Sequence, residues 1–246
     1  MTAGAPVERI RIRFSKLGKV RFTSHRDVAR IWERALRRAD LPIAYTEGFS
    51  PRPKLSFGLA LSTGHESLGE YVDVAFPEGS VPVDLERLPE LLSPALPAGI
   101  EVQTVQALQA GAPSLQQAVT SCTWHIEIGA VRPPAVAEAV ADALAATDLP
   151  VTRERKGRPV NDDVRPAILD LRVLGPSGTG TLIEAELATQ PRALRPAELV
   201  AALDATWVPT RVTRISQWTQ DGGARREVID LGQAATPLPH AEVRAS

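Results

Sequence analysis

Two apolar periodicities follow one another along residues 9–105 in an order that strongly limits the possible folds. Apolar and charged residues alternate from 9 to 14, which predicts a strand, and apolar spacings of three and four over residues 28–39 predict a helix capped by Ser24. Strands are expected again at 55–59 and 69–76, a helix at 83–96 despite Pro89, and a strand at 100–105. The order β-α-β-β-α-β is typical of the ferredoxin-like, or split βαβ, arrangement.

The same order of elements returns in the second half of the chain. Residues 109–120 are small and polar, as in a linker, and are followed by a strand at 124–128 and an alanine-rich helix at 134–146. A basic hairpin at 153–159, strands at 168–173 and 181–187, a helix at 196–203 and a strand at 211–218 complete the pattern. We therefore predict an α+β protein of tandem ferredoxin-like repeats, with one domain at 1–110 and a second at 121–220. Glycine, proline and charge dominate 221–246, which predicts a disordered tail.

Composition excludes several classes of protein. No apolar run approaches the roughly 18 residues of a membrane span, and residues 1–8 lack the features of a secretory signal, so we expect a cytoplasmic protein without membrane contact. Cys122 is the only cysteine, which rules out an internal disulfide, a Cys-x-x-Cys zinc site and an iron–sulfur cluster. The histidines also lack metal-site spacing, and we expect neither a metal nor a cofactor. They are His25, His65, His125 and His240.

Positive charge is concentrated near the start of the chain. Residues 9–56 hold 13 Lys and Arg against 4 Asp and Glu, whereas the whole chain has a formal net charge of −1. Such segregation creates a local positive field, which favours an anionic partner. The alternative is a solvated basic surface without a partner.

Basic and aromatic side chains are the main candidates for binding that partner. Arginine suits phosphate because its planar fork donates two hydrogen bonds at once, and exposed aromatic rings stack on bases. We expect the first-strand cations to face solvent and the helix arginines to share the outer face of the helix. For the two rings in the 45–54 loop, core packing is the alternative to stacking. The candidates for RNA or anion binding are Arg11, Arg13, Lys16, Lys19, Arg21, His25, Arg26, Arg30, Arg34, Arg37, Tyr45, Phe49, Arg52, Lys54, Arg155 and Lys156.

Evidence for catalysis is limited to one histidine. Walker A, Gly-x-Ser-x-Gly and dinucleotide-binding motifs are absent. His25 follows the helix cap, where it either bonds locally or serves as an acid–base group, since histidine changes charge near neutral pH. Cys122 begins an apolar strand and is expected to be a core residue. Glu66 and Glu70 flank Gly69 without a recognisable acid–base partner.

Two long runs resemble one protein family. They are RIRFSKLGKVRFTSHRD at 11–27 and ERALRRADLPIAYTEGFSPRPKLSFG at 33–58, with further matches at Gly64, Glu66, Gly69, Glu70, 155–157 and 163–166. These motifs resemble the radical-SAM-linked (radical-SAM-associated) proteins, a family without an assigned activity. Arg26 stands where that family usually has leucine. The chain is similar to the stand-alone actinobacterial form, which tends to be encoded beside a radical SAM protein and ribonuclease E/G, and this implies a role in RNA modification or processing.

Three functions remain open from the sequence. The first is an accessory RNA-binding module that acts with a separate radical SAM enzyme. The second is a metal-free RNA-processing enzyme that uses His25 with Tyr45 or Lys54. The third is a protein–protein adaptor whose basic face docks on an acidic partner. DNA is not expected as a partner, and all three functions require the cations of residues 11–54 to converge on one surface.

Overall fold

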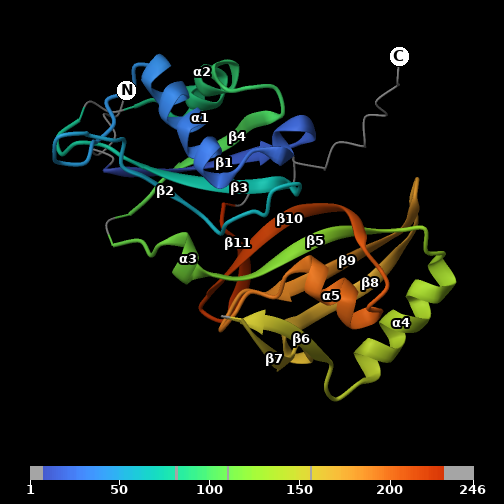
Figure 1. Ribbon diagram of the computed structural model, residues 1–246. Helices are drawn as coiled ribbons and strands as arrows, with labels where there is room; N and C mark the ends of the chain where they lie inside the picture. The colour runs from blue at the N-terminus through green and yellow to red at the C-terminus, as the bar shows by residue number, and fades with distance from the viewer. Residues whose placement is uncertain (1–7, 81–82, 110, 156, 230–246) are drawn as a thin grey trace, which may run out of the picture.

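A nine-stranded sheet runs through both halves of the chain in the computed structural model, which describes residues 8–80, 83–109, 111–155 and 157–229 (Figure 1). In the first half, the spatial order is β4-β1-β3-β2, and each neighbouring pair is antiparallel. The elements are β1 (Arg9–Lys16), η1 (Gly18–Phe22), α1 (His25–Arg38), β2 (Leu55–Phe57), β3 (Glu66–Ala75), η2 (Leu85–Arg87), α2 (Leu88–Leu92), η3 (Ser93–Ala95) and β4 (Ile100–Ala107).

The second half repeats this arrangement with one insertion. Its spatial order is β10-β5-β9-β8, again antiparallel throughout, and the hairpin β6–β7 forms a separate two-stranded sheet between α4 and β8. The mixed α+β class predicted from the sequence is confirmed. The elements are α3 (Leu115–Ala118), β5 (Val119–Gly129), α4 (Pro133–Ala145), β6 (Pro150–Arg155), β7 (Arg158–Asp163), η4 (Arg165–Ala167), β8 (Ile168–Pro176), β9 (Gly180–Ala188), α5 (Pro196–Leu203), β10 (Pro209–Asp221) and β11 (Ala224–Glu227).

The two halves join edge to edge through β3 and β10. These strands pair in parallel where Glu66 and Ser67 lie opposite Thr213 and Arg214. We call the chain between β4 and β5, which includes α3, the connecting segment. It packs against the protein, because Leu115 of α3 is buried in the hydrophobic core of the second half. No helix in the described part of the chain is long and apolar enough to span a membrane.

The end of the chain differs from the disordered tail expected from residue 221. β10 extends to Asp221, and the chain returns as β11, which pairs with β10 and leads to the buried Ile229. The cause is an apolar residue, Ile229, that lies beyond the charged turn and reaches the core of the second half. The remainder of the expected tail, 230–246, lies outside the described residues.

The first-half core forms between the helices and one face of the sheet. The Ser24 side chain accepts a hydrogen bond from the Asp27 backbone N–H. Ser24 is therefore the N-cap of α1, as predicted from the sequence. α1 buries Trp32 on the sheet, where its ring meets Phe14 edge-on with centroids 4.9 Å apart. Pro89 starts α2 instead of interrupting a longer helix, so the segment predicted at 83–96 consists of three short helical pieces.

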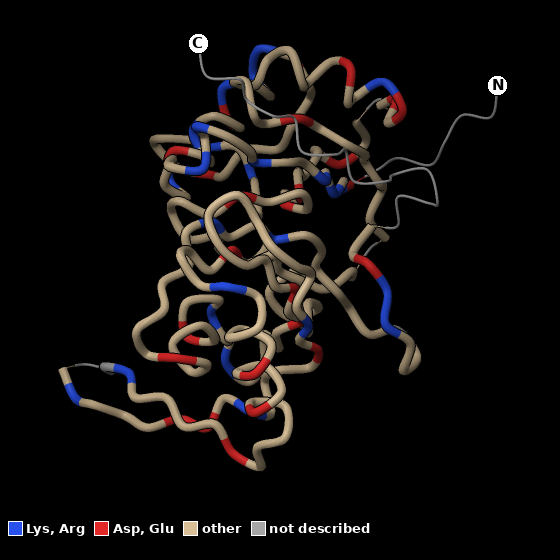
Figure 2. Tube along the Cα trace, turned by 90° about the vertical axis from the view of Figure 1, so that its right-hand side faces the viewer, with Lys and Arg blue, Asp and Glu red and all other residues tan. Residues whose placement is uncertain are grey.

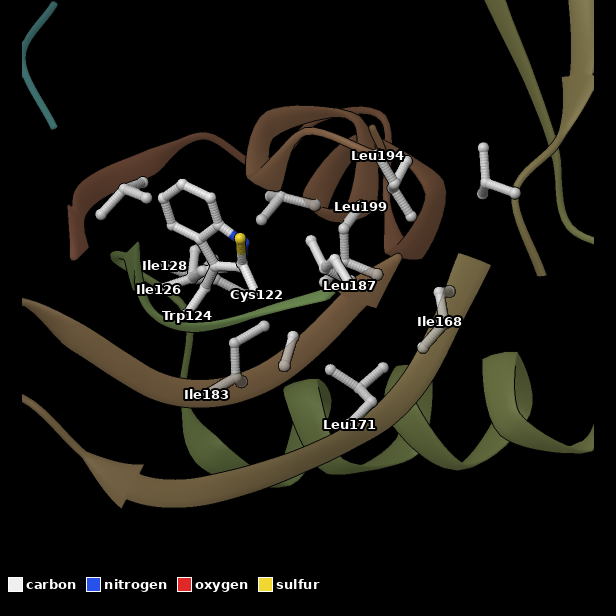
Figure 3. Close-up of a cluster of buried hydrophobic side chains, with 14 of the residues drawn as sticks. Cys122, Trp124, Ile126, Ile128, Ile168, Leu171, Ile183, Leu187, Leu194 and Leu199 are labelled. Carbon is white, nitrogen blue, oxygen red and sulfur yellow. The ribbon is translucent and has the colours of Figure 1, made fainter. Parts of the chain in front are cut away.

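The second-half core is a separate cluster. Figure 3 shows the side chains of β5, β8 and β9 gathered against α4 and α5. Cys122 belongs to this cluster (Figure 3), and the residue is 2% exposed. Burial raises the pKa of the Cys122 thiol to about 11. Cys122 is therefore a core residue, as the sequence predicted.

Candidate nucleic-acid interface

Helix α1 carries a row of exposed arginines. Arg26, Arg30, Arg34 and Arg37 all lie on its solvent side, opposite the buried apolar stripe. Steps of four residues separate the first three by about 6 Å along the helix axis. Among the described residues, only Arg30 of this row forms an ion pair, with Asp27 at 3.3 Å. The row predicted from the sequence therefore exists, and most of its charge is not neutralised by a carboxylate.

The loop between α1 and β2 is a braced hairpin. Tyr45 and Pro53 form an isolated bridge, and backbone bonds of 2.8 Å run from Thr46 N–H to the Arg52 carbonyl and from Lys54 N–H to the Ala44 carbonyl. The Arg52 N–H also donates to the Thr46 hydroxyl at 3.0 Å. These bonds hold the tip of the loop away from the core.

This loop presents aromatic and basic side chains to solvent. Phe49 is completely exposed, at 108%, and Tyr45 is 42% exposed. Gly48 precedes Phe49 with φ of 117°, a conformation that other residues rarely adopt. Arg52 and Lys54 are exposed on the segment that leads from the loop tip to β2. Core packing, the alternative considered for both rings, does not apply to Phe49.

Both features lie on the same half of the molecule. The Ala44 N–H donates to the Ala75 carbonyl at 2.8 Å, and Ala75 pairs with Arg9, so the loop starts at the end of the sheet where β1 begins. Figure 1 shows the loop extending past the sheet at the left of the view, reached from the end of α1 through segment 39–43. Elsewhere along the chain trace, Lys and Arg are interspersed with Asp and Glu (Figure 2).

The expectation that Arg11 faces solvent is wrong. It is 7% exposed and lies directly opposite Asp73 in the β1–β3 pairing. Its Nε and Nη2 donate to the two carboxylate oxygens at 2.7 and 2.9 Å. The connecting segment covers this face, because Arg11 also donates to the Pro113 carbonyl at 3.4 Å. Arg11 is thus neutralised and inaccessible to a partner.

Arg13 and Lys16 are also buried, contrary to expectation. Arg13 is 4% exposed, donates to Gln103 Oε1 at 2.9 Å and pairs with Glu227 of β11 at 2.8 Å. Lys16 is 3% exposed, and its ammonium donates to the Thr23 carbonyl at 3.1 Å. For Arg13 the physical reason is that β11 and the chain after it cover the outer face of β1, which is therefore buried instead of wet. Lys16 lies on the Phe14 side of the strand instead, where the segment that follows η1 encloses its ammonium.

The two remaining cations near β1 differ from each other. Lys19 is exposed on η1, which follows the first strand. Arg21 is half-buried, and its guanidinium lies over the Phe22 ring at 4.6 Å and 3.5 Å from Glu66. Only Lys19 is therefore free to extend the exposed cationic surface.

A small pocket lies at the beginning of α1. Lys16, His25 and Glu70 contribute its polar groups, and Phe14 and Phe57 contribute to its apolar walls. The exposed His25 meets the Phe57 ring edge-on at 5.3 Å. Burial is the main cause of a lowered pKa for Lys16. In the described structure no hydrogen bond or ring contact joins His25 to Tyr45 or Lys54, the partners expected from the sequence.

The partner of Glu70 was not predicted from the sequence. Arg214, 144 residues away, donates to Glu70 Oε1 at 2.9 Å and to the carbonyls of Leu59 and Ala60 at 3.0 Å. One signal for Glu70 was present, since it alternates with Val72 and Val74 on the apolar face of its strand. A charged residue in that position requires a buried partner.

A second ion pair also joins the two halves. Glu66 is 2% exposed, and it accepts hydrogen bonds from the Gly18 N–H and from Arg211 Nε, both at 2.8 Å. Arg211 belongs to β10, so this carboxylate connects the turn after β1 with the last long strand of the second half. Neither Arg211 nor Arg214 was a candidate from the sequence, because local patterns do not show pairing between distant strands.

The remaining candidates lie on the hairpin β6–β7, which projects from the second half (Figure 2). Arg155 pairs with Arg158 at the end of the hairpin, but its side chain, like the whole of Lys156, lies outside the described residues. Within the described ranges, no cluster of three or more His, Cys, Asp or Glu side chains can hold a metal ion.

Comparisons with known proteins give a family match and a weak structural similarity. A family model described as an uncharacterized protein conserved in bacteria (DUF2344) matches residues 9–196. No curated protein matches the chain. A solved chain from a Cbf5-Nop10-Gar1 complex is similar at 10% identity with a TM-score of 0.47, over 85% of this chain and 48% of that chain. This chain thus spans about half of that protein, and a similarity of this size carries no argument about function.

Proposed function

We propose a function from the premise that this chain belongs to the family of uncharacterized proteins conserved in bacteria (DUF2344), whose model matches residues 9–196. The proposed function is that of an accessory RNA-binding module in the cytoplasm, which acts with a separate radical SAM enzyme in RNA modification or processing. The radical SAM partner rests only on the resemblance carried by residues 11–27 and 33–58.

The supporting observation is a set of exposed residues on α1 and the 45–54 loop, which we call the α1–loop face. Its cations project from α1 and from the braced loop, and within the described structure only Arg30 is paired with a carboxylate. Unneutralised guanidinium groups attract phosphate and hold it through paired hydrogen bonds. The α1–loop face consists of Arg26, Arg30, Arg34, Arg37, Arg52 and Lys54, together with Tyr45 and Phe49.

The proposed domain organisation is two ferredoxin-like domains, at 1–110 and 121–220. It is supported by the strand order, because in each half the fourth strand lies beside the first and the third lies between the first and the second. This is the order of the split βαβ arrangement. The α1–loop face belongs entirely to the first of these domains.

A filter-binding assay with total cellular RNA at two salt concentrations tests the RNA-binding function. Contact with about five phosphates on a single strand gives a slope of log affinity against log salt of roughly −3.5. The double variant Arg34→Ala/Arg37→Ala should weaken binding and reduce the slope by about 1.4. Arg87→Ala/Arg132→Ala is a matched control, since both arginines are exposed and neither belongs to α1 or to the 45–54 loop.

Absent or salt-independent binding would refute the RNA-binding function. Co-purification with a radical SAM protein is a separate test of the partner, and it is carried out before and after nuclease treatment. If this chain has no affinity for RNA and its complex with the radical SAM protein survives nuclease treatment, the chain is an adaptor that docks on an acidic protein partner instead.

The pocket at the start of α1 favours a second candidate function, an RNA-processing activity that uses His25. A solvent-facing histidine, a buried lysine with a lowered pKa and a carboxylate line the same pocket, and acid–base catalysis needs such groups within reach of one substrate. The test compares cleavage of RNA by the wild type and by His25→Ala. Equal, background-level cleavage by both proteins would dismiss this activity.

A further inference from the structure

Phe49 is the most exposed large apolar side chain among the described residues. Its exposure is not caused by a loose loop, because the bridge between Tyr45 and Pro53 and the backbone bonds at Thr46 and Lys54 fix the stem of the hairpin. An exposed phenylalanine buries no apolar surface on folding, whereas it would bury its ring on binding, and the fixed stem lowers the conformational entropy that the loop loses when it binds. This geometry indicates that the ring contacts a partner.

Phe22 provides an internal comparison. It is also exposed, at 63%, but the Arg21 guanidinium already lies over its ring at 4.6 Å. One face of Phe22 is therefore already occupied, and a partner could stack on that face only by displacing the cation. In the described structure, no cation–ring or ring–ring contact involves Phe49, so both of its faces are open.

The charges around Phe49 determine what kind of ring it meets. Arg52 and Lys54 are exposed on the segment that leads from the loop tip to β2, and neither forms an ion pair within the described residues. They outnumber the one carboxylate of the loop, that of the exposed Glu47. An exposed ring beside two cations complements a flat apolar group that carries a negative charge nearby. A nucleobase attached to its phosphate is such a group. A base already paired and stacked in a duplex hides both faces, whereas an unpaired base leaves them free.

We propose that Phe49 stacks on an unpaired nucleobase while Arg52 and Lys54 hold the adjoining phosphates, so that the α1–loop face binds single-stranded RNA in preference to duplex RNA. This inference rests on the proposed RNA-binding function and specifies its substrate class. Tyr45, half-exposed at the stem of the loop, offers a second ring for the next base.

The experiment measures the affinity of the full chain for a single-stranded oligoribonucleotide and for a duplex of the same length and sequence. The single strand carries 2-aminopurine, whose fluorescence falls when it stacks. Phe49→Ala should weaken binding of the single strand by roughly 5- to 150-fold and abolish the fluorescence change, with little effect on the duplex. Phe49→Trp should restore both signals, because indole also stacks.

Two controls separate stacking from other effects. Phe22→Ala removes an exposed ring that has Arg21 over one face and lies outside the α1–loop face. It should leave the affinity for single-stranded RNA unchanged. Arg34→Ala/Arg37→Ala should weaken single-stranded and duplex RNA alike, since phosphate contacts do not distinguish them. Phe49→Ala should unfold at the wild-type temperature, because the side chain makes no core contact.

The outcomes distinguish failure of this inference from failure of the proposed function. If the wild type binds neither single-stranded nor duplex RNA, the proposed function and this inference are both refuted. If it binds both RNAs equally and Phe49→Ala binds the single strand like the wild type, RNA binding stands and the stacking role of Phe49 is refuted. The second result would assign Phe49 to a protein partner.

Discussion

The pair formed by Arg11 and Asp73 gives the sharpest test of the structure. Asp73→Ala removes a carboxylate that accepts hydrogen bonds of 2.7 and 2.9 Å from one guanidinium. The two side chains are only 8% and 3% exposed, so Arg11 would be left charged and buried without its partner. Removing one partner of a buried pair costs about 3–5 kcal/mol, because water cannot replace it.

This cost is large enough to measure by thermal unfolding. For a chain of this size, 1 kcal/mol shifts the melting temperature by about 2–4 °C, so Asp73→Ala should unfold roughly 6–20 °C below the wild type. The double variant Arg11→Met/Asp73→Leu replaces both charges by apolar groups of similar size. It should recover most or all of the loss, because neither charge then needs to be desolvated.

The same variants test whether Arg11 contributes to the α1–loop face. Arg11→Met/Asp73→Leu should bind RNA like the wild type, whereas Arg34→Ala/Arg37→Ala should not. A double variant that is as unstable as Asp73→Ala would contradict the buried-pair argument. Weakened RNA binding by a stable double variant would show that Arg11 is accessible and that the surface extends over β1.

Further predictions concern stability and reactivity. Burial and the neighbouring Arg214 lower the pKa of His65. As the pH falls below about 6.5, the unfolded chain therefore takes up a proton at His65 before the folded chain does, and the free energy of unfolding decreases. His65→Phe should reduce this decrease when denaturant titrations are compared between about pH 7 and pH 5. Cys122 should not react with a thiol reagent in the native protein but should react in urea, and rapid native labelling would contradict its burial. Gly99→Ala should lower the unfolding free energy by more than about 1 kcal/mol, since φ is +95° and the added methyl would lie 2.2 Å from the Leu17 carbonyl oxygen; wild-type stability would refute this close approach.

Much of the fold was predictable because its elements are locally encoded. The cap at Ser24, the buried stripe of α1 and the exposed arginine row all follow from helical spacing, which neighbouring residues determine. The helix predicted at 134–146 occurs at Pro133–Ala145, and that predicted at 196–203 occurs at Pro196–Leu203. The candidate site was predictable to the same extent, through the outer face of α1 and the cations of the 45–54 loop.

The buried polar part of the first half could not be predicted in the same way. Alternation along β1 correctly placed Arg11 and Arg13 on the face opposite Ile12. It could not show that the connecting segment and β11 cover this face, since both come from later parts of the chain. The pairing of Glu70 with Arg214 was hidden for the same reason.

Local patterns in the sequence alone determined the order of the elements, the residues that share each face and the basic character of α1. Only the tertiary structure decided which of those faces meet water, and hence that Arg34 is available to a partner whereas Arg11 is not. It also decided that Phe49 stands in solvent rather than in the core. The physical reason is that periodicity depends on neighbours along the chain, whereas burial and charge neutralisation depend on segments that only folding brings together.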